Sequence, residues 1–197
     1  VSASTHVVIV PAGVSSTDFG SSARAYWTFK VFGHAKVSIL DGGFSGWQTT
    51  YPEQIETGPF VAPEAGDFIA QFKPGLYIGT EDVANYVNNP GDAVLVDGRN
   101  TGQFYAEAKH PKAVKAGRIP SAILISQANA YGDDNNRLKS RDELKEIYDD
   151  MDDKTIVSYC NTGHWAATNW FVMSEVLGLE NVRLYDGSMV EWTAHSD

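Results

Sequence analysis

The sequence predicts an α/β protein with an open parallel sheet flanked by helices. Short apolar runs suited to buried strands alternate with helical patterns along most of the chain. One such run leads directly into the only cysteine, Cys160, and a glycine-bearing loop and a helical pattern follow it. Ligands of open parallel sheets bind at the carboxyl ends of the strands. We therefore expect the functional site to lie around Cys160.

The first fifty residues are expected to contain strands and a helix of their own. A buried-strand pattern covers residues 7–10 and ends at Pro11. Residues 13–22 are polar and are predicted to form a loop, 23–32 a helix, and 37–40 a second strand. Residues 51–66 contain three prolines, and their hydrophobic residues follow neither a helical nor a strand period, which is typical of a linker.

The rest of the chain continues the alternation of strands and helices. Apolar and polar residues alternate at 68–72, which predicts a strand. Thr80 is suited to cap a helix over 81–88. Ser140 and Glu143 form a capping-box pattern at the start of a helix that reaches Tyr148. Buried parallel strands are expected at 93–96, 122–125 and 156–159.

The position of Cys160 favours a reactive thiolate. It follows the strand 156–159, and a loop with Gly163 separates it from a helix expected over 166–177. If the loop curls over the sulfur, backbone N–H groups and the positive end of the helix stabilise negative charge there. The alternative is a buried and inert cysteine, which is common in protein cores.

Composition excludes several classes of function. The chain has 197 residues, 43% of them hydrophobic, which allows a sizeable core. The net charge of −10 and the lack of a Lys/Arg-rich run argue against nucleic-acid binding. No apolar run approaches the ~20 residues of a membrane span. We expect a soluble protein of the cytoplasm or the periplasm, and a single cysteine does not distinguish these compartments.

Several motifs together resemble a known family. Four motifs occur in this order along the chain: Asp-Gly-Arg at 97–99, Gly-Arg-Ile-Pro-Ser-Ala at 117–122, Cys-Asn-Thr-Gly-His-Trp-Ala at 160–166, and the segment 182–192. They resemble the catalytic half of a rhodanese-like sulfurtransferase of the tandem-domain type, which acts on thiosulfate or 3-mercaptopyruvate. The resemblance covers about residues 60 to 195 and implies the rhodanese fold.

An internal repeat extends the resemblance to the beginning of the chain. Residues 37–47 align without gaps with 182–192, which lie 145 positions later. The resemblance therefore implies that residues 1–50 are the C-terminal half of an inactive rhodanese-like domain, 51–66 the linker, and 67–197 the catalytic domain. This N-terminal half domain is expected to be inactive, because residues 13–22, which stand where the second domain has its cysteine loop, contain no cysteine.

The first half of that domain is absent from the sequence. Val1 is not an initiator methionine, and we expect either that a preceding segment has been removed or that the sequence is a fragment. Without that half, Trp27, Phe29 and Ile39 are predicted to expose apolar faces. A second polypeptide that supplies the missing half domain would cover them.

The resemblance implies a role for each residue of the cysteine loop. Cys160 is the nucleophile that carries sulfur as a persulfide, with no cofactor and no metal. Arg99 either binds the anionic substrate or forms a structural ion pair with Asp97, and we expect a structural role for Asp97. The expected substrate-binding residues are Asn161, Thr162, Gly163, His164, Trp165 and Arg99.

Two departures from the family pattern concern the donor. Gln103 stands where many of these enzymes carry an arginine that binds substrate. The loop after Cys160 lacks the Arg and Lys of the thiosulfate type, and it also lacks the Gly-Ser of the mercaptopyruvate type. Arg24 is expected on a helix surface, with a reach across the domain interface toward an anion as the alternative. A basic cluster either gates an anionic substrate or is a solvated loop face. Its members are Lys109, Lys112, Lys115 and Arg118.

These observations predict a sulfurtransferase. The donor is expected to be a small sulfur-containing anion such as thiosulfate or 3-mercaptopyruvate, and the acceptor a thiol or cyanide. A phosphatase-like site needs an arginine six positions after the cysteine, where this chain has Ala166. The alternative from another class is a sulfur-carrier or regulatory module that is loaded by a protein partner.

Overall fold

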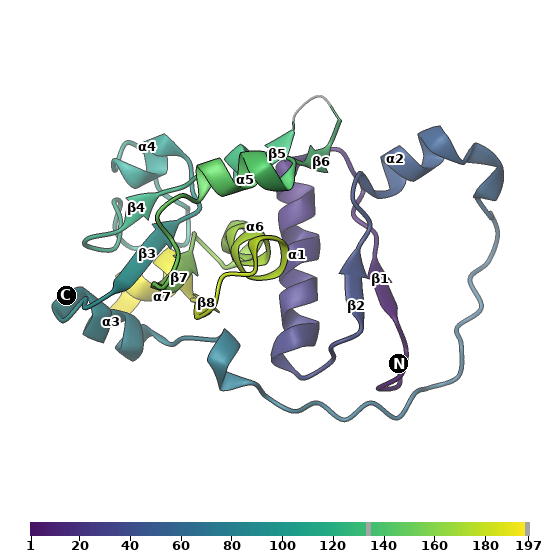
Figure 1. Cartoon of the computed structure of the whole chain (residues 1–197), viewed down its shortest axis with the longest axis horizontal. Coiled ribbons are helices and arrows are strands. Elements are labelled where there is room, and N and C mark those ends of the chain that lie inside the picture. Colours follow the sequence, from purple (N-terminus) through teal and green to yellow (C-terminus); the bar gives the residue numbers. More distant parts are fainter. Residues whose placement is uncertain (133–134, 196–197) are drawn as a thin grey trace.

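The main body of the protein is a four-stranded parallel sheet. The computed structural model describes residues 1–132 and 135–195. The strand order of the main sheet is β4–β3–β7–β8 (Figure 1). Its strands are β3 (Ala93–Asp97), β4 (Ile123–Leu124), β7 (Thr155–Tyr159) and β8 (Val182–Leu184). The prediction of an open parallel sheet flanked by helices is confirmed.

The two central strands, β3 and β7, place the start of the cysteine loop in the core. They pair in parallel from Ala93 with Thr155 to Asp97 with Tyr159. Every residue of β7 after Thr155 is buried, which is why this strand has no alternation of apolar and polar residues. Its buried serine is satisfied because Ser158 Oγ donates to the carbonyl of Ala166 at 2.8 Å.

Helices cover the sheet and connect its strands. The α-helices are α1 (Ser16–Val31), α2 (Gly43–Thr50), α3 (Thr80–Asn88), α4 (Thr101–Phe104), α5 (Arg141–Ile147), α6 (His164–Phe171) and α7 (Ser188–His195). Short 3₁₀ segments are η1 (Pro52–Gln54), η2 (Pro74–Leu76) and η3 (Gln127–Ala130), and the π-helix η4 (Val172–Leu177) continues α6. None of the helices in the described ranges is long and apolar enough to cross a bilayer.

A second, smaller sheet lies on the far side of α1. Its strands β1 (Val7–Ile9) and β2 (Val37–Ile39) are parallel, and α1 connects them (Figure 1). The opposite face of α1 packs against α6, where the rings of Tyr26 and Phe171 meet edge to face at 4.9 Å. The Tyr26 hydroxyl also donates to the Glu175 carboxylate at 2.5 Å. Helix α1 therefore joins the two sheets.

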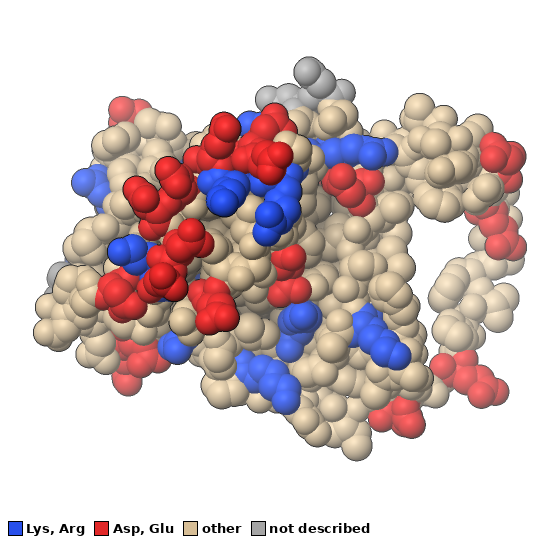
Figure 2. All heavy atoms as spheres, viewed as in Figure 1, with Lys and Arg blue, Asp and Glu red and all other residues tan. Residues whose placement is uncertain are grey.

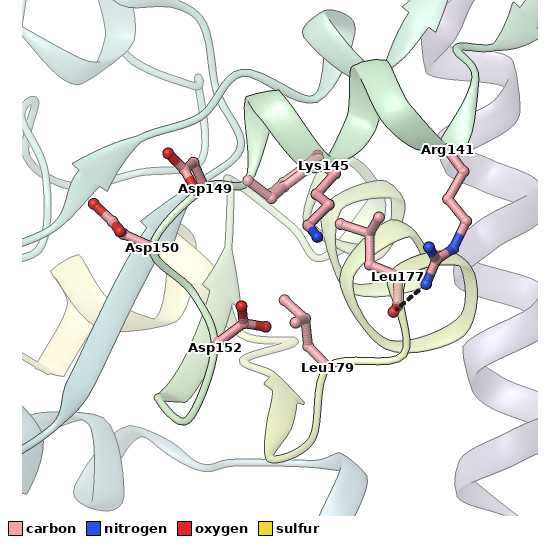
Figure 3. A pocket seen from close by; sticks show the side chains of 8 residues that line it. Arg141, Lys145, Asp149, Asp150, Asp152, Leu177 and Leu179 are labelled. Carbon is pink, nitrogen blue, oxygen red and sulfur yellow. Dashed lines mark hydrogen bonds between the residues drawn. The ribbon is translucent and has the colours of Figure 1, made fainter.

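Local signals at α5 are confirmed. Ser140 Oγ accepts from the Glu143 N–H at 3.4 Å, and the Glu143 carboxylate accepts from the Ser140 N–H at 2.9 Å. An antiparallel pair, β5 (Tyr131–Gly132) and β6 (Arg137–Leu138), precedes this capping box. Arg141 then reaches the end of η4, where it donates to the carbonyl of Leu177 (Figure 3) and to that of Val176. Those carbonyls have no partner within the helix, so Arg141 satisfies them.

Three local predictions are wrong. Residues 13–22 are not a loop throughout, because α1 begins at Ser16 with Ser15 as its cap, accepting from the Asp18 N–H at 3.2 Å. Residues 68–72 form no strand. Their backbone bonds are scattered, since the Phe68 N–H donates to the carbonyl of Val1 and the Gln71 N–H to that of Phe32, just after α1. Thr80 does not cap α3, and its hydroxyl instead lies 2.7 Å from that of Tyr185.

The expected exposure of Trp27, Phe29 and Ile39 is also wrong. Trp27 is 4% exposed, and its indole N–H donates to the carbonyl of Leu76 at 3.0 Å. Phe29 and Ile39 are half-buried against the main core. The reason is that Trp27 belongs to a core cluster to which α1 and α6 both contribute, and Phe29 and Ile39 pack against that cluster. The exposed apolar side chains of the small sheet and of α2 are instead Val8, Val10 and Phe44.

Candidate active site

The backbone of Cys160 is held from both sides at the end of β7. Its N–H donates to Ser188 Oγ at 3.0 Å, and its carbonyl accepts from the Met189 N–H at 3.0 Å. Ser188 in turn donates to the carbonyl of Tyr185 at 2.8 Å. Cys160 is 2% exposed and lies in the wall of a cavity of about 250 Å³. The first residues of α7 thus fix where the sulfur sits.

The loop after Cys160 carries backbone donors without protein acceptors. Within residues 1–132 and 135–195, no acceptor is found for the N–H groups of residues 161–166, whereas that of Ala167 donates to Gly163 at 3.0 Å. Gly163 has a φ of +84° and directly precedes α6. Unpaired N–H groups at a turn and a helix start stabilise a nearby negative charge. The loop is therefore suited to hold an anionic sulfur.

Gly163 is required at this turn for two reasons. Its positive φ disfavours any side chain, and a Cβ there would collide with the carboxylate of Asp186. Arg24 of α1 holds that carboxylate at 2.6 Å and stacks over Trp27 at 4.4 Å from the ring centroid. Arg24 thus reaches across the interface, but it binds Asp186, not the cavity.

The walls of the Cys160 cavity come from both parts of the chain. They are formed by Thr17, Ser21, Gln103, His110, Cys160, Asn161, Thr162, His164 and Trp165. Thr17 and Ser21 belong to α1, and Thr17 Oγ1 accepts from the indole N–H of Trp165 at 3.1 Å. Sequence reasoning missed these two because it placed them in a loop. The only indication of them in the sequence was the internal repeat of 37–47 and 182–192, which implies that the helix before residue 37 lies next to the end of a strand.

Most of the predicted loop residues meet at the cavity. Asn161, Thr162, His164 and Trp165 all line it, and Gly163 forms the turn between them. The Asn161 side-chain N–H₂ donates to Gln103 Oε1 at 3.1 Å. His164 Nδ1 lies 3.2 Å from the carbonyl of Thr162, with its ring exposed at the entrance.

Arg99 lies in the core and does not line the cavity. Its Nε donates to both carboxylate oxygens of Asp97. Its Nη2 donates to Asp97 Oδ2 and to the carbonyl of Gly117 at 2.7 Å. Burial opposes its charge, yet its pKa is raised because the hydrogen bonds and negative charge of Asp97 outweigh that cost. This geometry favours the structural ion pair over contact with substrate.

The basic cluster is also outside the cavity wall. Lys109 Nζ donates to the carbonyl of Ala113 at 2.7 Å. Arg118 stacks over the ring of Phe104 at 4.5 Å and donates to the carbonyl of the same residue. None of Lys109, Lys112, Lys115 and Arg118 lines the cavity in the described part of the chain.

A second hollow lies at α5, away from Cys160. It has a volume of about 200 Å³ and is lined by Arg141, Lys145, Tyr148, Asp149, Asp150, Asp152, Leu177 and Leu179 (Figure 3). Acidic and basic side chains are mixed over this face of the molecule (Figure 2). The hollow contains no nucleophile matched to a set of unpaired donors, so the Cys160 cavity is the better candidate.

Replacing Gly163 with alanine tests how tightly the loop is built. Gly178 is a matched control, because its φ is +80° but no atom lies within 4 Å of a Cβ there. Gly178→Ala should cost about 1–2 kcal/mol for the positive φ alone. Gly163→Ala should lower the free energy of unfolding by about 1–3 kcal/mol more than Gly178→Ala, because the added Cβ overlaps with Asp186. Urea denaturation of both variants measures the difference, and equal losses would contradict the close approach.

Comparison with known proteins identifies relatives of this arrangement. A family model described as the rhodanese-like domain matches residues 80–195. The chain is 33% identical over 196 residues to the 3-mercaptopyruvate sulfurtransferase of Escherichia coli K12, covering 98% of this chain and 66% of the relative. It is 32% identical over 183 residues to the thiosulfate sulfurtransferase of Corynebacterium glutamicum, which covers 87% of this chain and 59% of the relative.

Solved structures show the same fold. SseA from Escherichia coli, described as a 3-mercaptopyruvate sulfotransferase, aligns with a TM-score of 0.77 and 30% identity over 95% of this chain and 68% of its own. The Tum1 protein of Saccharomyces cerevisiae aligns with a TM-score of 0.82 and 22% identity over 99% and 68%. The chain spans less than two thirds of the length of these two curated sequence relatives.

Proposed function

The chain belongs to the rhodanese-like domain family, and from this membership we propose that it is a sulfurtransferase that carries sulfur on Cys160. The observation that carries the proposal is the row of unpaired N–H groups at residues 161–166 beside the cavity that contains the thiol. Relatives named as thiosulfate and 3-mercaptopyruvate sulfurtransferases support it.

The reaction would proceed in two substitutions at sulfur. The Cys160 thiolate attacks the outer sulfur of thiosulfate, or the thiol sulfur of 3-mercaptopyruvate, and a new S–S bond forms. The bond between that sulfur and the rest of the donor, S–S in thiosulfate or C–S in 3-mercaptopyruvate, breaks. The rest of the donor leaves with the bonding pair as sulfite or as the enolate of pyruvate. A thiol or cyanide then takes the outer sulfur and restores the thiolate. Neither step requires a redox cofactor.

The cavity residues have distinct roles in this scheme. The loop N–H groups spread the charge of the persulfide, in the manner of an oxyanion hole. Asn161, Thr162, His164 and Trp165 contact the donor, while Gly163 allows the turn that aligns them. We assign Arg99 a positioning role, because its guanidinium binds Asp97 at the end of β3 and Gly117 in the next loop.

One observation favours the sulfur-carrier alternative. In the described ranges, no lysine or arginine lines the cavity to bind a small anionic donor. A carrier module would instead receive sulfur from the persulfide of a protein partner. Such a module would form a stable persulfide but transfer sulfur from small donors to cyanide at a negligible rate.

We also propose that residues 1–50 are half of an inactive domain and that residues 67–197 form the catalytic one. The repeat supports this, because β2 and β8, like α2 and α7, begin and end at positions related by the same offset in sequence. The half domain leaves an apolar groove of about 470 Å³ open to solvent. It is lined by Val8, Val10, Leu40, Phe44, Trp47, Gln54, Ile55 and Glu56. A polypeptide that supplies the other half would cover it.

Replacing Cys160 with serine should abolish sulfur loading and leave the fold intact, since the side chain keeps nearly the same size. Intact-mass measurement after incubation with thiosulfate or 3-mercaptopyruvate should show a gain of about one sulfur atom for the wild type. Cyanide should remove it, and the variant should gain nothing. Sulfur transfer to cyanide by Cys160→Ser would reject the assignment. A persulfide that forms without turnover would support the carrier alternative.

The open groove should make the isolated chain associate. Burial of each apolar side chain there is worth about 1.5–3 kcal/mol, so the wild type should self-associate or bind a second polypeptide in sedimentation experiments. Phe44→Glu in the groove should weaken association. Phe60→Glu is the matched control, because Phe60 is 85% exposed and lies outside the groove. A wild type that is stable and monodisperse as a single chain would argue against a second polypeptide that covers the groove.

A further inference from the structure

An acidic side chain lies directly behind the loop that follows Cys160. Asp186 comes two residues after the end of β8, and its Oδ1 atom faces Gly163 so closely that a Cβ there would collide with it. The side chain of Asp186 is 35% exposed and that of its partner Arg24 is 21% exposed, so both are partly shielded from solvent. A formal negative charge therefore stands beside the turn that is suited to hold an anionic sulfur.

Without a partner, the carboxylate of Asp186 would work against an anion at Cys160. The N–H groups of residues 161–166 have no acceptor within the described ranges, and a carboxylate is a strong acceptor for backbone N–H groups. A like charge close to a thiolate or a persulfide also disfavours the anionic form, more so in a partly buried site than in water. A free carboxylate here would thus compete with the sulfur for its donors and repel its charge.

Arg24 holds this carboxylate in a fixed place. Its Nη2 pairs with Asp186 Oδ1 at 2.6 Å, and this is the oxygen that faces Gly163. Its Nη1 donates to Thr28 Oγ1 at 2.9 Å, and Thr28 Oγ1 donates in turn to the carbonyl of Arg24 at 2.8 Å. The guanidinium carbon lies 4.4 Å from the centre of the buried Trp27 ring. Such a set of contacts suits the planar, forked guanidinium and not an ammonium group on a flexible stem.

We propose that Arg24 is a positioning residue for Cys160, because it holds Asp186 and cancels its charge so that the loop N–H groups remain available to the sulfur. The inference rests on the proposed sulfurtransferase function and adds to it a residue from the N-terminal part of the chain. Among the described residues, Arg24 is not part of the cavity wall. It therefore acts through Asp186 and not on the donor.

The other ionisable groups around Cys160 are accounted for in the described part of the chain. His110 and His164 belong to the cavity wall. Asp97 and Arg99 form a closed ion pair at the end of β3. Substitutions at Arg24 and Asp186 leave all four side chains in place, so a change in the reactivity of Cys160 can be assigned to the exchanged charges.

The test follows alkylation of Cys160 by iodoacetamide from about pH 4 to pH 9, the range over which protein thiols ionise. Cys160 is the only cysteine, so each added label reports on it. Arg24→Gln leaves Asp186 without its cation, and the alkylation profile should move to higher pH by about one unit, which is typical of a like charge near an ionisable group. Loading by thiosulfate and by 3-mercaptopyruvate, measured by intact mass at neutral pH, should slow by up to about tenfold.

A double variant and a matched control separate charge from packing. Arg24→Gln combined with Asp186→Asn removes the unpaired charge without restoring the contacts of Arg24, so the alkylation profile should return to the wild-type position. Lys30→Gln is the control, because Lys30 lies on the same helix and pairs with Glu175 of η4 at 3.2 Å, outside the cavity wall. It should lower the free energy of unfolding without moving the profile.

An Arg24→Gln profile that coincides with that of the wild type would overturn the inference. A double variant as strongly shifted as the single one would also overturn it, because Arg24 would then have a merely structural role. A wild type that is alkylated at Cys160 but loaded by neither donor would count against the sulfurtransferase function instead. The alkylation profiles would still decide whether Arg24 controls the reactivity of Cys160.

Discussion

The site depends on the way the backbone of Cys160 is held between β7 and α7. Ser188 accepts the N–H of Cys160, and the next residue, Met189, donates to its carbonyl. With both backbone groups of the cysteine satisfied by α7, the loop that follows must turn at Gly163 before α6 can begin. The turn leaves the N–H groups of residues 161–166 without acceptors among the residues that the structure describes. These unpaired donors thus follow from the position of the turn between β7 and α6.

Helix α1 completes the cavity from outside the four-stranded sheet. It supplies Thr17 and Ser21 to the cavity, and Arg24 to the carboxylate of Asp186 beside the turn. The same helix packs on α6 through Tyr26, so its position is set by the core as well as by these polar contacts. The N-terminal part of the chain therefore has a physical use, since α1 forms part of the wall of the Cys160 cavity.

Features encoded locally were predictable from the sequence, and features that arise from packing were not. The strand before Cys160, the turn at Gly163 and the cap at Ser140 each depend on adjacent residues. The burial of Trp27 and the role of Thr17 depend on the contact between α1 and α6, which no local pattern reveals. Gln103 stood out as a departure from a family pattern, but its bond to Asn161 required the fold to bring α4 beside the loop.

The central claim is that the unpaired N–H groups of residues 161–166 hold the charge of a sulfur atom on Cys160. Amide NMR spectra of the protein before and after loading with 3-mercaptopyruvate or thiosulfate, and again after cyanide, test it most directly. The account predicts that the amide resonances of this loop move downfield on loading and return with cyanide, while those of the small sheet stay in place. A persulfide confirmed by mass with unchanged loop amides would contradict it.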